Sequence, residues 1–188
     1  MNLNYRDSIL DELEKWLYSV SDEEINRFIA QIAISKNIIG YGAGRMGLSL
    51  KAFMMRLSHL NKYAYYYTDT NIPHVGKEDL YIFASGSGKT RTVLQLAEIA
   101  KEKGCRIASI VGDKDSPLAK LSDVVITFKS CNGGLNSEDN SNKIDSIQIM
   151  STLNEQGVYL LCDLIAKRYC DILMIEEKDL RNNHNNVE

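Results

Sequence analysis

Hydrophobic and polar positions along the first part of the chain follow a helical period. Between residues 5 and 33, apolar residues recur at three- and four-residue spacing, as Leu10, Leu13 and Leu17 illustrate. This spacing places them on one face of a helix. Ser21, followed directly by acidic residues, interrupts the pattern, and a serine before acids is typical of a helix start. The sequence therefore predicts two consecutive helices before the first strand.

Short apolar runs then alternate with helical segments. Five runs are candidates for buried strands, at residues 37–41, 63–67, 80–84, 106–111 and 124–128. Helical periodicity returns at 48–60 and at 93–103, where Gly104 supplies a stop signal. Strands that alternate with helices indicate a parallel sheet covered on both faces. The fold class expected is α/β, a three-layer α/β/α sandwich around a five-stranded parallel sheet.

The last part of the chain begins with a polar stretch and ends in a long helix. Residues 130–146 are rich in Asn, Ser, Gly and Asp, which predicts a mobile loop. A helix is expected from about residue 149 to residue 173, followed by a polar tail. We expect a single domain over 1–188, made of N-terminal helices (1–35), an α/β core (36–129), the loop, and a C-terminal helix with its tail (147–188).

Composition narrows the classes of function. The net charge is −3, so no large basic surface is expected to bind nucleic acid. No apolar run is long enough to span a membrane, and the N-terminus lacks the order of a signal peptide. The four cysteines show no short metal-binding or redox spacing. We expect a cytoplasmic protein with free thiols and no metal site.

The first glycine-rich loop invites a dinucleotide interpretation. Residues 42–47 match the pattern GxGxxG, follow a strand and open a helix, and Asp69 ends the next strand, where an acid would hold a ribose. The pattern alone is weak, because glycines are needed wherever a backbone must approach a phosphate. We therefore expect no nicotinamide or flavin cofactor.

The second loop, residues 85–90, resembles the end of a nucleotide-binding P-loop. The full motif needs a glycine five residues before Gly88, where this chain has Phe83. Three hydroxyls and two glycines at a helix N-terminus instead suit one phosphate; the alternative is a simple helix cap. The candidate binding residues are Ser85, Gly86, Ser87, Gly88, Lys89 and Thr90, with Gly44, Arg45 and Met46 from the first loop.

Several stretches resemble the SIS (sugar isomerase) domain family. They are the pattern Ser85-x-Ser87-Gly88-x-Thr90 and the segments Gly42–Arg45, Lys51–Leu60, Asp115–Val124 and Ser151–Gln156. Within the family, the resemblance is strongest to the 6-phospho-3-hexuloisomerases. It implies a flavodoxin-like fold, a phosphorylated ketohexose as substrate, and no cofactor. In such enzymes the isomerisation of this ketohexose follows formaldehyde capture by a ribulose phosphate, as in the ribulose monophosphate pathway.

Four positions depart from what the family usually has. Met46 stands in place of a serine that helps to bind substrate, and Lys89 stands in place of an acid. Residues 68–70 read Thr-Asp-Thr instead of Gly-Glu-Thr, and Asn154 replaces a phenylalanine. Lys89 either adds positive charge near the phosphate or points to solvent, and the solvated interpretation is favoured.

The resemblance also implies the catalytic residues. Glu155 would be the base, although a glutamate in the first turn of a helix is often only favourable to the helix dipole. His59 would shuttle a proton or open the sugar ring, or else cap the end of its helix. His184 is a candidate to reach a neighbouring subunit, and Arg45 either contacts the ligand or pairs with an acid.

The helices at both ends of the chain carry more apolar residues than one small sheet can cover, which favours a homo-oligomer. The resemblance implies a tetramer built as a dimer of dimers. Two alternatives to the hexuloisomerase stay open: an isomerase of another phosphosugar, and a sensor that binds a phosphosugar without chemistry. The 35 or so residues before the first strand are too few for the DNA-binding domain of known sensors. The presence of Glu155 and His59 favours an enzyme.

Overall fold

A parallel sheet forms the centre of the computed structural model, which describes residues 4–131, 143–184 and 186–187. Its five strands are ordered β2-β1-β3-β4-β5, and every neighbouring pair is parallel. The strands are β1 (Asn37–Gly42), β2 (Tyr63–Tyr66), β3 (Leu80–Ser85), β4 (Arg106–Val111) and β5 (Val124–Thr127). The order places β3 in the middle, so that the second loop starts from the centre of the sheet.

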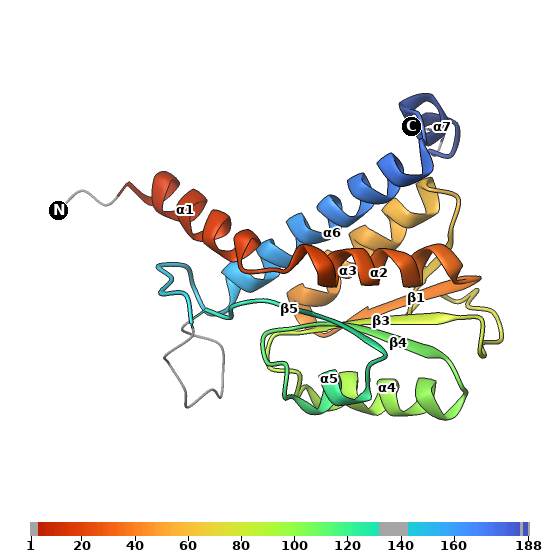
Figure 1. Ribbon diagram of the computed structural model, residues 1–188, viewed down its shortest axis with the longest axis horizontal. Helices are drawn as coiled ribbons and strands as arrows, with labels where there is room; N and C mark the ends of the chain where they lie inside the picture. Colours follow the sequence, from red (N-terminus) through yellow and green to blue (C-terminus); the bar gives the residue numbers. More distant parts are fainter. Residues whose placement is uncertain (1–3, 132–142, 185, 188) are drawn as a thin grey trace.

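Helices cover both faces of this sheet. They are α1 (Tyr5–Tyr18), α2 (Asp22–Ile34), α3 (Gly44–His59), α4 (Arg91–Glu102), α5 (Pro117–Leu121), α6 (Thr152–Leu173) and α7 (Glu177–Asn182). In Figure 1, α2, α3 and α6 lie on one side of the sheet, while α4 and α5 lie on the other. The three-layer α/β/α sandwich with a five-stranded parallel sheet is therefore confirmed.

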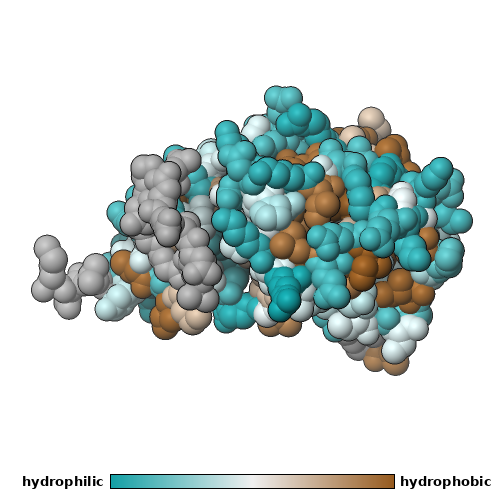
Figure 2. All heavy atoms as spheres, turned by 90° about the horizontal axis from the view of Figure 1, so that it is seen from below, coloured by the Kyte–Doolittle hydropathy of each residue, from teal (hydrophilic) through white to brown (hydrophobic). Residues whose placement is uncertain are grey.

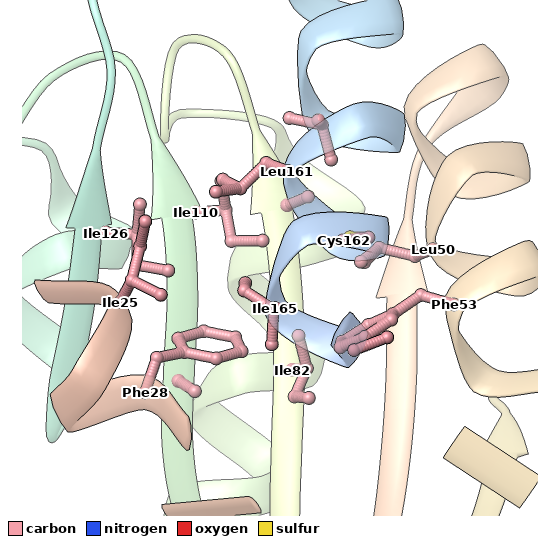
Figure 3. Packing of buried hydrophobic residues seen from close by; sticks show 14 of the residues in the cluster. Ile25, Phe28, Leu50, Phe53, Ile82, Ile110, Ile126, Leu161, Cys162 and Ile165 are labelled. Carbon is pink, nitrogen blue, oxygen red and sulfur yellow. The ribbon is translucent and has the colours of Figure 1, made fainter. Parts of the chain in front are cut away.

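The larger core lies under α2, α3 and α6. Figure 3 shows Phe28 of α2, Phe53 of α3 and Ile165 of α6 meeting above the strand residues Ile82 and Ile110, all of them buried. Successive strand side chains point to opposite faces. A second cluster under α4 and α5 therefore takes the alternate residues of the same strands. Burial on both faces explains why β3 reads as a continuous apolar run.

Several helix boundaries differ from the sequence prediction. α3 begins at Gly44 instead of Leu48, so that Arg45 and Met46 lie in its first turn and not in a loop. α6 begins at Thr152, three residues later than predicted. The short helices α5 and α7 were not predicted, although Ser116 and Pro117 supply a cap and a first-turn proline for α5.

Only the flanks of the predicted mobile loop can be compared with the structure. Of residues 130–146, the stretch 132–142 lies outside the described residues. At its two flanks, Cys131 and Ile144 form an isolated parallel bridge. These flanks therefore lie side by side, next to the start of α6.

The surface over α4 and α5 is mainly hydrophilic, with hydrophobic patches between the polar side chains (Figure 2). Among the residues that the structure describes, no helix is both long and apolar enough to cross a membrane. The same residues contain no cluster of three or more side chains suited to hold a metal ion.

All four cysteines are free thiols. Cys105, Cys131 and Cys162 are buried, and Cys170 is partly buried. Burial raises the pKa of each of these thiols. The thiolate form, which is the reactive one, is therefore scarce in the folded protein.

Candidate functional site

The main cavity opens at the carboxyl ends of the central strands and has a volume of about 800 Å³. Open parallel sheets bind their ligands at this edge. Its lining comes from both loops, from the segments that follow β4 and β5, and from the start of α6. Of the predicted site residues, the lining includes Met46, Ser85, Gly86, Ser87, Lys89, Thr90 and Glu155.

The second loop is shaped by hydrogen bonds among its own residues. The hydroxyls of Ser85 and Thr90 are 2.9 Å apart, and the backbone N–H of Gly88 donates to Ser85 Oγ at 3.1 Å. The N–H of Lys89 donates to Ser87 Oγ at 3.2 Å. These bonds hold the hydroxyls at the N-terminus of α4, where backbone N–H groups and the helix dipole favour an anion.

Gly88 lets this loop pack against the turn that precedes α5. Its φ is +60°, in the left-handed region, and a Cβ placed on it would lie 2.1 Å from Ser116 Oγ. Its carbonyl oxygen accepts a hydrogen bond from the N–H of Leu118 at 3.2 Å. The glycine is therefore required by backbone conformation and by space together.

The two departures from the family pattern in these loops have different surroundings. Lys89 is about half exposed, and its Nζ lies 4.0 Å from Asp113 Oδ2 at the rim of the cavity. Met46 is buried and lines the cavity together with Ala43 and Ala84. One wall of the cavity is therefore apolar where the family usually offers a hydroxyl.

Glu155 projects into the cavity from the first turn of α6, where it forms an ion pair with Arg45 of α3. The Glu155 side chain is 15% exposed and that of Arg45 is 64% exposed. Ser151 Oγ lies 3.4 Å from Glu155 Oε1, and Ser49 Oγ donates to the Glu155 carbonyl oxygen at 2.9 Å. The acid that pairs with Arg45 is thus the proposed base itself.

The first loop is supported by the edge strand. The hydroxyl of Tyr66 donates to the carbonyl oxygen of Gly42 at 2.9 Å. Asp69 Oδ2 accepts the N–H of Tyr66 at 2.8 Å, so that this carboxylate caps a turn of its own segment. Gly44 opens α3 with a φ of +57° and thereby aims Arg45 toward α6.

His59 and His184 lie together at the other end of α3. Their ring centroids are 5.0 Å apart, and Asn183 Nδ2 donates to the His59 carbonyl oxygen at 2.9 Å. Burial lowers the pKa of His59, and the nearby Arg56 and His184 lower it further. Since α3 has 16 residues and a helix rises about 1.5 Å per residue, this end is roughly 22 Å from its start. Within one chain, neither histidine joins Glu155.

Several residues that border the cavity have no active-site role in the sequence prediction. Ser19, Ser21 and Glu24 come from the N-terminal helices and the turn between them, a region for which the sequence predicts only a part in oligomerisation. Asn154 was noted only as a departure from the family, yet it is 1% exposed and lines the cavity. Asn154 could have been identified from the sequence, because it places an amide on the apolar face of a helix, where a buried polar group needs hydrogen-bond partners.

A match to a family model shows the class of protein to which this fold belongs. The SIS domain family matches residues 31–132, just over half of the 188-residue chain. The matched part contains both loops and all five strands. The chain belongs to the SIS domain family.

Relatives within the family carry a more particular name. A 3-hexulose-6-phosphate isomerase of Mycobacterium gastri is 33% identical over 180 residues, which span 96% of this chain and 88% of that protein. One of Bacillus subtilis is 29% identical over 98% of this chain and 97% of that protein. The crystal structure of a Methanococcus jannaschii protein, for which the same activity has been inferred, superposes with a TM-score of 0.81 at 27% identity, covering 99% of this chain and all of that one.

Proposed function

We propose that this protein is a phosphosugar isomerase that converts 3-hexulose 6-phosphate into fructose 6-phosphate, the step that follows formaldehyde capture by a ribulose phosphate. The names of the full-length relatives support this substrate. The observation that carries the proposal is the position of Glu155, which lines the same cavity as the phosphate loop. A base and a phosphate anchor in one cavity are what this isomerisation needs.

In the proposed reaction, the loop of residues 85–90 holds the 6-phosphate while Glu155 transfers a proton between neighbouring carbons. The carboxylate removes the proton from C2, which leaves an enediolate across C2 and C3. The same carboxyl group returns the proton to C3, and the hydroxyl proton moves from O2 to O3. One carboxylate can perform both transfers when it is held close to both carbons, which are directly bonded to each other.

Arg45 has two roles in this proposal. Its guanidinium fixes the orientation of the Glu155 carboxylate through the ion pair. A cation placed beside the base can also stabilise the negative oxygens of the enediolate. Met46 lines the cavity where the family usually has a serine, so the sugar hydroxyls are bound by other groups.

We further propose that the protein acts in the cytoplasm as a homo-oligomer, either a dimer or a tetramer, with active sites near subunit contacts. Large apolar side chains are exposed on α3 and α6, which favours association; they include Leu48, Met55, Tyr159, Leu160 and Leu164. Such an assembly would let His59 and His184 of one copy serve the cavity of another. The four free thiols suit a reducing compartment.

The test is a coupled assay that follows fructose 6-phosphate formed from 3-hexulose 6-phosphate, with Glu155→Gln beside the natural protein. We expect kcat to fall by about 10²- to 10⁴-fold in the variant, the usual contribution of general acid–base catalysis. Activity that survives the substitution would retain the function and exclude Glu155 as the base. A natural protein that shows no turnover, but whose Tm rises with fructose 6-phosphate, would instead be a sensor.

A further inference from the structure

One face of α1 contacts both ends of the connection between β5 and α6, and it also contacts the first turn of α6, which carries Glu155. Glu12, Trp16 and Ser19 are spaced by four and three residues, so that they share a face of the helix. α1 precedes the residues that match the SIS family. In Figure 1 it lies beside the segment that connects β5 to α6. The contacts of this face give α1 a use that its sequence did not suggest.

Glu12 holds the segment that enters α6. It is 5% exposed, and its carboxylate accepts hydrogen bonds from the N–H of Ile147 at 2.8 Å, from Ser146 Oγ at 2.7 Å and from Gln148 Nε2 at 2.9 Å. Burial by itself raises the pKa of Glu12, but the hydrogen bonds from Ile147, Gln148 and Ser146 outweigh burial and hold the pKa below its usual value. A buried carboxylate with three donors is a strong anchor.

Trp16 holds the first turn of α6 directly. It is fully buried, and its Nε1 donates to Asn154 Oδ1 at 3.2 Å. Its ring lies so close to α6 that a Cβ on Gly157 would be 2.3 Å from Trp16 Cδ2. Asn154 is the neighbour of Glu155, so this contact fixes the backbone that carries the base.

Asn154 also forms hydrogen bonds with the segment that follows β5. Its Oδ1 also accepts the N–H of Cys131 at 3.2 Å, and its Nδ2 donates to Ser130 Oγ at 3.1 Å. At the C-cap of α1, Ser19 Oγ accepts the N–H of Lys129 at 3.0 Å. Both flanks of the connection between β5 and α6 are therefore tied to the same helix face.

We propose that the Glu12–Trp16–Ser19 face of α1 is a clamp that positions Glu155 for proton transfer, with Glu12, Trp16 and Asn154 as positioning residues. The clamp rests on the proposed function, because it assigns these residues to the step performed by Glu155. The hydrogen bonds that shape the phosphate loop involve none of the three α1 residues. Loss of the clamp therefore affects the chemical step and leaves phosphate binding in place.

The test compares Glu12→Ala with Glu14→Ala, which removes an exposed carboxylate from the same helix. A displacement of about 1 Å at a reacting group can cost roughly 100-fold in rate. We expect Glu12→Ala to lower kcat by about 10- to 100-fold with KM nearly unchanged, and Glu14→Ala to change neither. Glu12→Gln retains one carbonyl acceptor, so it should recover part of the lost kcat.

Hydrogen exchange supplies a second measurement that does not depend on turnover. In Glu12→Ala, the amide of Ile147 and the first turn of α6 should exchange faster, while the amides of β3 and of residues 85–90 should not. A rise in KM at constant kcat, or no change in kcat despite faster exchange, would overturn the clamp. Should the natural protein show no isomerase activity, the proposed function fails separately, and unchanged exchange in the variant would then overturn the clamp by itself.

Discussion

The two walls of the cavity are built in opposite ways. The proposed phosphate wall is one continuous segment, residues 85–90. Its internal hydrogen bonds join residues at most five positions apart, and its backbone bonds to Gly112 and Leu118 span at most 30 positions. On the catalytic wall, the ion pair of Arg45 with Glu155 joins residues 110 positions apart, and the bond from Trp16 to Asn154 spans 138 positions. The first wall therefore depends on segments near it in the sequence, whereas the second forms only after both ends of the chain have come together.

Because of this difference, we expect substrate binding and proton transfer to respond differently to changes in packing. The loop of residues 85–90 keeps its shape as long as β3, α4 and the segment between β4 and α5 are formed. A wall assembled from α1, α3 and α6 depends on how three helices pack. We therefore expect disturbances of helix packing to lower kcat more than they lower the affinity for phosphate. Substitutions that disrupt each wall in turn test this expectation.

Of the three substitutions that compare the two walls, Gly88→Ala is expected to have the largest effect, because it disrupts the proposed phosphate wall. The new Cβ would lie 2.1 Å from Ser116 Oγ at a φ of +60°, so the loop must move. We expect KM to rise by more than about tenfold and the free energy of unfolding to fall by about 2–4 kcal/mol, from left-handed strain together with overpacking. Steady-state kinetics and urea unfolding measure the two quantities.

Gly76→Ala is the matched control for that substitution. A Cβ at Gly76 meets no atom within 4 Å, so both quantities should stay close to those of the natural protein. An unchanged KM in Gly88→Ala would show that the loop does not anchor the substrate.

A smaller effect is expected from Gly157→Ala, which breaks the catalytic wall. A Cβ at this position would lie 2.3 Å from the ring of Trp16, so α1 and α6 must separate. We expect a loss of about 1–3 kcal/mol in stability and a fall in kcat at nearly constant KM. Combining it with Trp16→Leu makes room for the methyl group, so the double variant should be less destabilised than the sum of the single variants. Simple additivity would contradict the contact.

The smallest effect concerns the pH dependence of Glu12. Its pKa in the folded protein is lowered, so its contribution to stability is present above the pKa of the unfolded chain and is lost as the pH falls through the lower, folded pKa. A net contribution of about 1 kcal/mol corresponds to a Tm difference of roughly 2–4 °C from Glu12→Gln at pH 7.

Thermal unfolding from pH 7 down to pH 3 measures this difference, which should shrink in acid. Glu14→Gln controls for the loss of one carboxyl group from α1. A difference between the natural protein and Glu12→Gln that grows in acid would reverse the expected sign.

The sequence predicted the local features of the molecule well. The five strands follow from apolar runs, and the loop at residues 85–90 follows from closely spaced hydroxyls and glycines; both are properties of short segments. The start of α3 was placed four residues late, because glycines at positions 44 and 47 have low helix propensity and packing on the sheet overrides it. A local pattern states the type of element more reliably than its ends.

The catalytic wall could not be predicted in the same way. Glu155 was proposed as the base from a family resemblance, whereas its pairing with Arg45 and the contacts of Glu12 and Trp16 depend on how distant helices meet. No periodicity encodes such pairs. His59 was predicted to take part in catalysis, and the length of α3 separates it from Glu155 within one chain.

The buried cysteines give the protein a set of internal reporters. A thiol reagent reacts with the thiolate. The raised pKa of each thiol keeps the thiolate rare in the folded protein. Cys105 lies in the core under α4, Cys131 lies beside the cavity, and Cys162 lies within α6. The rate at which each cysteine is labelled would therefore report how often the part of the fold around it opens, and no engineered probe is needed.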